Sequence, residues 1–260
     1  MLDTPYKLKA FPKMRILISE FLRRSRIKNN INLFVEADVS NLMHFRQEQR
    51  ELGLDFSLPI YILYCFARLL QNHPDLISMR KGNKLFQFEN ADILTVVERE
   101  GENGTKVPMA IIIRDAGGKS YVEIYNEVRN SQVEPPENIL EVKKRRRLLN
   151  FPSWLIRLSI AHAQSHPVRY CKHYGNAAFT SPVRGGNARF SIAVPISSCT
   201  LSLLLNSTFK KVISVNGSFV ESTFMGFTFV VDHDIIDGAR GMRIVDEFCK
   251  MVEALPVLDK

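Results

Sequence analysis

Apolar residues recur every three or four positions in five stretches of this chain. Such spacing places the apolar side chains on one face of a helix, the face that packs on a core. The predicted helices cover residues 14–29, 41–53, 57–78, 117–133 and 239–255. The stretch 57–78 is apolar nearly all round, so we expect it to be buried. It should end near His73 and Pro74, because the residue before a proline disfavours helix.

Shorter runs rich in β-branched and aromatic residues predict strands between and after these helices. They cover residues 31–40, 84–89, 91–100, 107–115, 177–181, 189–195, 198–206, 210–222 and 224–233. The stretch 135–175 is the least regular, with one further predicted helix through Trp154 and Ile160. No internal repeat or long linker interrupts the pattern, which predicts a single α/β domain over residues 1–260.

Composition narrows the class of protein. Hydrophobic residues make up 45% and charged residues 24% of the 260 residues, which excludes a disordered, collagen-like or disulfide-scaffold chain. No apolar run approaches the roughly 20 residues of a transmembrane helix, and the first residues contain no apolar signal-peptide core. We therefore expect a cytoplasmic protein with no membrane contact. The cysteines lie far apart without a CxxC pair, which predicts reduced, buried thiols and no zinc site. They are Cys65, Cys171, Cys199 and Cys249.

The net charge is +8, from 35 Lys and Arg against 27 Asp and Glu. A positive balance favours an anionic partner such as nucleic acid, a phosphorylated cofactor or an acidic protein, without choosing among them. We expect no nucleic acid partner, because neither interleaved aromatic residues nor a recognisable binding module is present.

The most informative segment is FTFVVDHDIIDGARG, residues 227–241. A β-branched strand ends at Asp232 and His233, and Asp237 and Gly238 follow just before a helix. A histidine at the end of a buried strand can act as a general base near neutral pH. The alternative is a capped strand-to-helix turn with a hydrogen-bonded histidine.

The segment HDIIDG matches the H-x-x-x-D-G motif, and the chain resembles the coenzyme A-dependent acyltransferases that carry it. That superfamily includes the catalytic domain of dihydrolipoyl acyltransferases from 2-oxo acid dehydrogenase complexes, and chloramphenicol acetyltransferase. The segments MRILISEFLRRS, FVEADVSNLMHFR, ADILTVVEREGENGTKVPMAIIIRDAGGKSYVEI and VPISSCTLSLLLNSTFKK resemble family segments in the same order. The resemblance covers about residues 14–255.

Four departures from the family pattern stand out. Asp234 replaces the arginine of the usual D-H-R sequence, and Asp232 replaces the first histidine of the chloramphenicol acetyltransferase H-H pair. The long basic segment 135–174 is not typical of the dehydrogenase-complex core. No lipoyl or subunit-binding domain precedes residue 14, so we expect a stand-alone relative. The sequence does not identify its acceptor.

The resemblance implies residue roles. His233 would be the general base, and Asp237 would be structural, paired with Arg15, Arg23 or Arg24. A hydroxyl of the AAFTS segment would stabilise the oxyanion: Ser181 is the first choice and Thr180 the second, although both hydroxyls alternatively only satisfy a strand edge.

The same resemblance places Lys210 and Lys211 in a turn near the phosphates of coenzyme A, where a solvated turn is the alternative. The run Lys143–Arg147 would attract these phosphates or an acidic carrier protein, or would simply be a solvated helix face. His162 and His166 have helical metal-pair spacing without the glutamate of HExxH, so we expect no metal. Trp154, the only tryptophan, should anchor its segment by packing.

The resemblance implies a chloramphenicol acetyltransferase-like two-layer α/β sandwich with a mixed sheet and packed helices. The resemblance implies a homotrimer whose sites lie between subunits, with His233 of one chain facing the Ser181 region of its neighbour. The predicted function is acyl transfer from acyl-coenzyme A, as co-substrate, or from another thioester to a small-molecule acceptor with a hydroxyl, thiol or amine group, by His233 general-base catalysis in a ternary complex. The alternatives are a non-catalytic scaffolding homologue and an acyltransferase that uses an acyl carrier protein. Asp232 and Asp234 should favour the protonated form of His233 if they point toward it.

Overall fold

The computed structural model describes residues 4–26, 28–100, 106–135, 143, 147–182 and 191–254. The helices are α1 (Lys13–Ser25), α2 (Ser40–Glu51), α3 (Leu58–Asn72), α4 (Tyr121–Val133), α6 (Ser153–Gln164), α7 (Pro167–Tyr174) and α8 (Gly238–Glu253). The strands are β1 (Asn30–Asp38), β2 (Met79–Lys81), β3 (Lys84–Phe86), β4 (Ile93–Glu100), β5 (Lys106–Ile113), β6 (Ala177–Thr180), β7 (Leu201–Val215) and β8 (Ser218–Asp232).

Six of these strands form one mixed sheet in the order β1-β8-β7-β6-β4-β5. Strand β6 runs parallel to both β4 and β7, and every other neighbouring pair is antiparallel. Strands β2 and β3 form a separate small hairpin. The predicted mixed sheet is confirmed.

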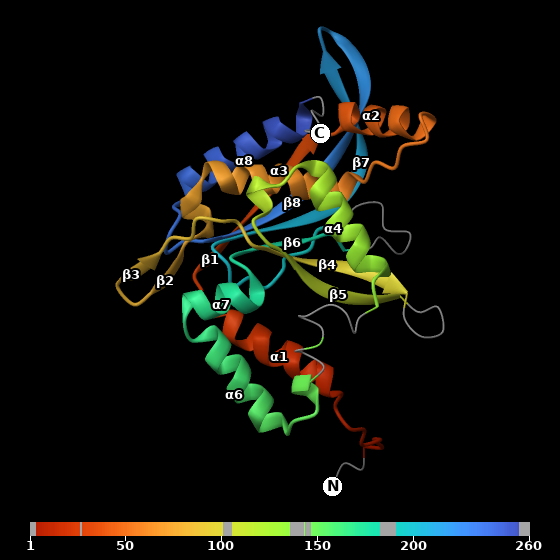
Figure 1. Ribbon diagram of the computed structural model, residues 1–260. Coiled ribbons are helices and arrows are strands. Elements are labelled where there is room, and N and C mark those ends of the chain that lie inside the picture. The colour runs from red at the N-terminus through yellow and green to blue at the C-terminus, as the bar shows by residue number, and fades with distance from the viewer. Residues whose placement is uncertain are drawn as a thin grey trace.

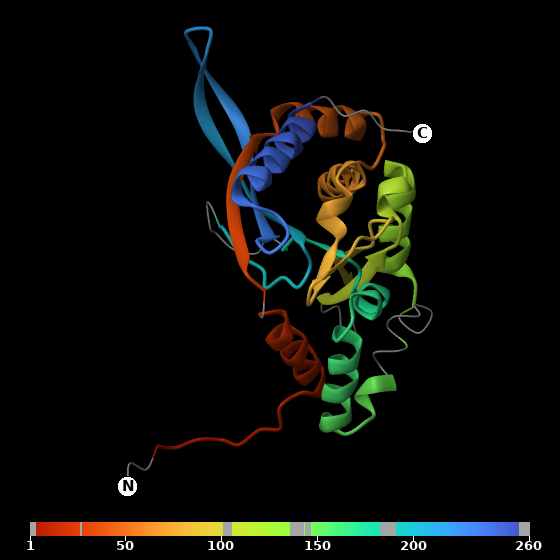
Figure 2. The same ribbon diagram turned by 90° about the vertical axis from the view of Figure 1, so that its left-hand side faces the viewer.

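Helices α2, α3, α4 and α8 lie on the same side of the sheet (Figure 2). Helix α3 is the centre of this layer, and eleven of its side chains are buried, including Leu69 and Leu70. Burying a leucine side chain contributes about 1.5–3 kcal/mol, so α3 supplies much of the core. The prediction that this stretch is buried nearly all round is confirmed, and the helix ends one residue before His73.

Strands β7 and β8 form a long hairpin whose far end projects beyond the sheet (Figure 1). The sequence pattern predicts three shorter strands here, but the structure has two strands of 15 residues each. The turn lies at Asn216 and Gly217, which have φ angles of 51° and 80°. This left-handed conformation suits Asn-Gly in a two-residue turn.

The predicted strand at 189–195 is wrong for the part that the structure describes, residues 191–195. Side chains replace the backbone ladder there: the Ser191 N–H donates to Ser207 Oγ at 3.0 Å, and the Ala193 N–H donates to Asn206 Oδ1 at 3.1 Å. Strand β2 was not predicted, and the irregular stretch contains two helices, α6 and α7.

None of the helices in the described ranges has the length and apolar character needed to cross a membrane.

Candidate active site

The segment HDIIDG forms the turn between β8 and α8. Strand β8 ends at Asp232, and its carbonyl oxygen accepts hydrogen bonds from the N–H groups of Ile235 and Ile236. Asp237 then caps α8: its Oδ1 accepts from the Arg240 N–H at 2.8 Å. A carboxylate is well suited to a helix N-terminus, because it satisfies a free N–H and meets the positive end of the helix dipole. The turn therefore fixes the segment that carries His233.

Asp237 was expected to pair with an arginine of the first helix. Within the described residues it makes no ion pair with Arg15 or Arg23. The Arg23 guanidinium instead contacts Glu20 on the same helix, with Nη2 2.6 Å from Oε1. The side chain of Arg24 lies outside the described part of the structure.

His233 is exposed at the end of β8. Its backbone N–H donates to the Asn29 carbonyl at 2.8 Å, which ties the turn to the residue just before β1. The backbone is therefore held while the imidazole stays open to a partner or substrate.

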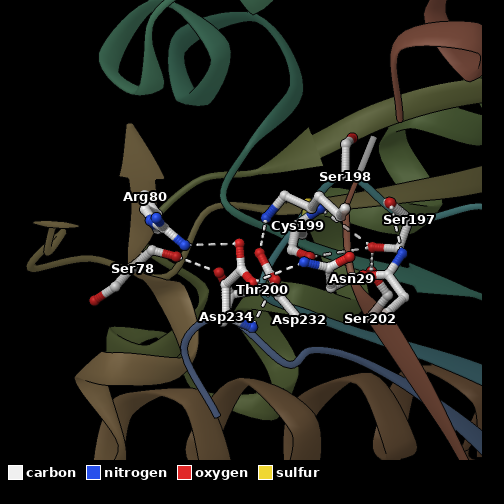
Figure 3. Close-up of polar contacts among 12 residues, drawn as sticks. Asn29, Ser78, Arg80, Ser197, Ser198, Cys199, Thr200, Ser202, Asp232 and Asp234 are labelled. Carbon is white, nitrogen blue, oxygen red and sulfur yellow. Dashed lines mark hydrogen bonds and ion pairs between the residues drawn. The ribbon is translucent and has the colours of Figure 1, made fainter. Parts of the chain in front are cut away.

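The two carboxylates that flank His233 each have a cationic partner. Asp232 is buried, and its Oδ2 lies 2.5 Å from Lys28 Nζ. Asp234 accepts from Asn29 Nδ2 at 2.9 Å and from Arg80 Nη1 at 3.0 Å, as Figure 3 shows. The hydrogen bond from Asn29 and the charge of Arg80 hold the pKa of Asp234 below its ordinary value. No local sequence pattern predicts this role for Lys28 or Arg80.

A cluster of small polar residues lies behind the end of β8 (Figure 3). The Asp232 N–H donates to the Thr200 carbonyl at 2.9 Å, and the Thr200 hydroxyl donates to the Ser78 carbonyl. Ser197 Oγ lies 2.5 Å from Ser202 Oγ. Buried polar groups that are satisfied in this way fix one arrangement of the chain.

Ser181 and Thr180 lie at the end of β6, beside a cavity of about 340 Å³. Helices α3 and α4 and strands β4 and β5 complete its walls, with Leu63 and Val128 among the apolar side chains and Arg129 and Glu98 among the charged ones. A hydroxyl here faces a space large enough for a reacting group.

Ser181 and His233 of one chain lie far apart along the strand direction of the sheet. Through the registers of β6 with β7 and of β7 with β8, the position after Thr180 aligns with Phe227, six residues before His233. At about 3.3 Å per residue this is roughly 20 Å along the strand direction alone. The two side chains of one chain therefore cannot meet at one reacting carbonyl.

Lys210 and Lys211 were expected in a turn, and this is wrong. Both lie within β7, because the turn comes later. Lys210 Nζ is 2.5 Å from a carboxylate oxygen of Glu221, and Lys211 pairs with Glu36 and lies over the rings of Phe209 and Phe224.

The other predicted candidates take ordinary positions or lie outside the structure. In the run Lys143–Arg147, residues 144–146 lie outside the described residues. His162 is on α6, whereas His166 caps α7 by accepting from the Val168 N–H. Among the described residues no group of three or more His, Cys, Asp or Glu could hold a metal ion.

Burial raises the pKa of all four thiols, to about 12 for three of them and about 11 for the fourth. A thiol of this kind stays protonated at neutral pH and is a poor nucleophile. The fourth is Cys199, and the other three are Cys65, Cys171 and Cys249.

A scan against protein-family models finds no match. Curated relatives are dihydrolipoyllysine-residue acetyltransferase components of pyruvate dehydrogenase complexes. The one from Rickettsia bellii is 22% identical over 92% of this chain and 51% of its own length. The one from Rickettsia conorii is 21% identical over 94% of this chain and 52% of its own length. The chain thus spans about half the length of the curated relatives it matches.

Solved structures match over nearly the whole chain. A probable dihydrolipoamide acetyltransferase from Listeria monocytogenes has a TM-score of 0.68 and 17% identity, over 98% of this chain and 99% of its own. Dihydrolipoamide acetyltransferase from Azotobacter vinelandii has a TM-score of 0.66 and 18% identity, over 96% and 93%. The cubic core of a pyruvate dehydrogenase multienzyme complex has the same values. This chain has the dihydrolipoamide acetyltransferase fold. Chloramphenicol acetyltransferase, with a TM-score of 0.50 and 15% identity over 95% and 96%, shares it.

The acetyltransferase fold and the curated relatives confirm the resemblance stated from the sequence. They also confirm the predicted fold class.

Proposed function

We propose that this chain transfers an acyl group from coenzyme A, or from another thioester, to a small hydroxyl, thiol or amine acceptor. The curated relatives are acetyltransferases, and the fold is that of acetyltransferase structures. The observation that carries the proposal is local: an exposed histidine on a capped, hydrogen-bonded turn at the end of β8.

In the proposed reaction, His233 takes the proton from the acceptor as the acceptor atom attacks the thioester carbonyl. The tetrahedral intermediate then collapses, the carbon–sulfur bond breaks, and the coenzyme A thiolate leaves and takes the proton back. General base catalysis of this kind is typically worth about 10²–10⁴ in rate. Acceptor and thioester meet in one ternary complex, and no acyl-enzyme forms.

We assign the oxyanion donor to Ser181, with Thr180 as second choice. A hydroxyl that donates to the developing oxyanion stabilises the transition state, and losing one such donor lowers the rate by about 10²–10³. The cavity beside Ser181 is the place for the reacting ends of the two substrates.

Residue spacing supports these roles. The crystallographic study of the Azotobacter vinelandii enzyme addressed a serine, a histidine and an asparagine in its catalytic mechanism. In that enzyme the histidine follows the serine by 52 residues and the asparagine follows the histidine by four. In this chain His233 follows Ser181 by the same 52 residues, and Asp237 follows by four.

The distance between Ser181 and His233 within one chain implies that a site takes each residue from a different chain. We propose a homotrimer, or a multiple of one, with His233 of one chain facing Ser181 of its neighbour. A cubic core is among the fold neighbours, and threefold axes pass through the corners of a cube.

Binding of coenzyme A phosphates by Lys210 and Lys211 stays a prediction, and it requires that phosphate displaces the carboxylates of Glu221 and Glu36. The scaffolding alternative rested on the extra negative charge of Asp234. The pairing of Asp234 with Arg80 compensates that charge and weakens the alternative.

Thiol release from a panel of acyl-coenzyme A species, with hydroxyl, amine and dithiol acceptors, tests the proposal. We expect turnover by the wild type and its loss in His233→Ala. His44→Ala, which removes an exposed histidine on α2, is the matched control and should keep full activity.

Binding without turnover would point to a missing acceptor, including an acyl carrier protein. The proposal that the acceptor is a small molecule of the classes tested would then be wrong. If coenzyme A thioesters neither bind nor react, the scaffolding alternative holds and the enzymatic proposal fails.

A further inference from the structure

Helices α1, α6 and α7 form a lobe at one end of the molecule, away from the layer of α2, α3 and α8 (Figures 1 and 2). Gln164 Nε2 on α6 donates to the Phe21 carbonyl on α1 at 3.4 Å, and the Phe21 ring lies 4.8 Å from the Tyr174 ring on α7. Residues 4–26 and 147–174 are here called the helical lobe.

The helical lobe holds the positive charge of the chain. It contains eleven Lys and Arg residues but a single acidic residue, Glu20, which already pairs with Arg23. The whole chain has a net charge of only +8. The rest of the molecule therefore has a small negative net charge, and the excess of cations is confined to this lobe.

The lobe also exposes large apolar side chains. Trp154 is 66% exposed and Leu158, one helical turn later, is 59% exposed, with the exposed Arg157 between them in sequence. Phe151 is 47% exposed just before the helix, and Met14 on the neighbouring α1 is 48% exposed. The prediction that Trp154 is packed is wrong, because the buried side of α6 is formed by Ile156 and Ile160 instead.

A cavity of about 300 Å³ opens among these helices. Leu17 and Ile160 are among its apolar lining residues, and Arg147 and Lys172 are its cations. No acidic side chain is among its described lining residues. Cations beside apolar walls match a ligand with an anionic head and an apolar tail.

We propose that the helical lobe binds the surface of a membrane that contains anionic phospholipids. Trp154 and Leu158 would enter the headgroup region, and the surrounding cations would meet the lipid phosphates. Exposed Trp, Phe and Leu beside Lys and Arg are the composition of interfacial membrane helices, and each cation near an anionic surface adds attraction. The sequence was expected to have no membrane contact because no span is long enough, but surface binding needs no span.

A second copy of this chain that meets the lobe with its own lobe fits less well. Two lobes in a symmetric contact would bring eleven cations against eleven, and like charges at short distance repel. A lipid surface also needs no matching shape, so protruding side chains such as Trp154 enter it freely.

The test uses the full-length protein and two kinds of vesicle, one of phosphatidylcholine alone and one that also contains phosphatidylglycerol. The protein should float with the anionic vesicles only, and added salt should release it. Because Trp154 is the only tryptophan, its emission should shift to shorter wavelength on binding and be quenched by lipids brominated in the acyl chain.

Leu158→Asp should weaken binding to anionic vesicles about tenfold or more, since it removes an apolar side chain that would enter the headgroup region and adds a negative charge. Leu54→Asp is the matched control, because Leu54 is 57% exposed but lies between α2 and α3, outside the lobe. That variant should bind like the wild type.

Three results would overturn the proposal. The first is a folded wild type that does not float with anionic vesicles. The second is binding that Leu158→Asp leaves unchanged, since residue 158 would then take no part in the contact. The third is a Trp154 emission that is already shifted without lipid, together with a smaller assembly in Leu158→Asp, which would make this face an interface between copies.

Discussion

Lys28 and Asp232 form a largely buried ion pair immediately before His233. Lys28 Nζ lies 2.5 Å from Asp232 Oδ2, and the Asp232 side chain is only 4% exposed. The Asp232 carboxylate also accepts from the Asp234 N–H at 3.2 Å. A buried carboxylate needs such partners, because water no longer solvates it. The pair therefore joins the segment before β1 to the turn that carries His233.

We expect Lys28→Met to lower the free energy of unfolding by about 3 kcal/mol, because it leaves the Asp232 charge buried and unpaired. The double variant Lys28→Met, Asp232→Asn should recover part of this loss. Urea denaturation measures both. Lys250→Met is the control: Lys250 pairs with Asp246 on an exposed helix face, so its loss should change stability by less than about 1 kcal/mol. Equal effects at the two lysines would show that the buried pair has no special role.

Arg80 compensates the charge of Asp234, so its loss should alter the pH dependence of activity. In Arg80→Met an unpaired carboxylate would stand near His233 and favour the protonated imidazole. The pH–rate midpoint should then rise. Arg80→Met with Asp234→Asn should return it to the wild-type position. A midpoint that does not move in Arg80→Met would show that Asp234 points away from the imidazole.

The same contacts affect stability at low pH. The pKa of Asp234 is lowered in the folded state by Asn29 and Arg80. A carboxyl with a lowered pKa contributes stability above its ordinary value near 4 and loses it as the pH falls through the folded-state pKa. Wild type and Asp234→Asn should therefore converge in stability at acid pH, as thermal unfolding at several pH values would show.

Mixing two inactive variants should restore activity if each site takes residues from two chains. Co-expressed Ser181→Ala and His233→Ala chains would form mixed assemblies in which about a quarter of the interfaces hold an intact pair. The expected activity is therefore about a quarter of the wild-type value, measured by thiol release. A chain that carries both substitutions, mixed with His233→Ala, should restore nothing. If mixing the single variants also restores nothing, the two residues act within one chain or do not act together.

Asp237 acts as a helix cap, so its replacement by asparagine should be tolerated. Asparagine caps helices about as well as aspartate, and asparagine stands at the corresponding spacing in the Azotobacter vinelandii enzyme. Asp237→Asn should keep stability and most of the activity, whereas Asp237→Ala should lose about 1 kcal/mol of stability. A severe loss of activity in Asp237→Asn would show that its charge is needed, for example by a partner arginine.

The sequence predicts the turn at His233 well because its determinants are local. A β-branched strand, a capping aspartate and a helix follow one another within residues 227–241, and the structure has the same order. The partners of the flanking carboxylates could not be predicted. Arg80 is 154 positions from Asp234, and Lys28 is 204 positions from Asp232. Such pairs depend on how the elements pack, which no local pattern records.

The sequence pattern also could not predict that Trp154 is exposed or that Lys210 lies within a strand. Trp154 is apolar and was expected inside, but α6 packs through a different side of its surface. Lys210 was placed in a turn by the family resemblance. The turn residues Asn216 and Gly217 allow the strand to continue instead.

The far end of the β7–β8 hairpin has consequences for how the protein behaves at high concentration. Strand β1 pairs with β8 only from Phe224 onward, and no other strand in the described part of the chain pairs with the far part of the ribbon. Open strand edges invite pairing with other chains, and charged side chains on an edge oppose it. Lys210, Lys211 and Glu221 stand on this ribbon, so these charges would keep neighbouring molecules from growing a shared sheet. Replacing these charged residues with neutral ones should therefore increase aggregation at high protein concentration.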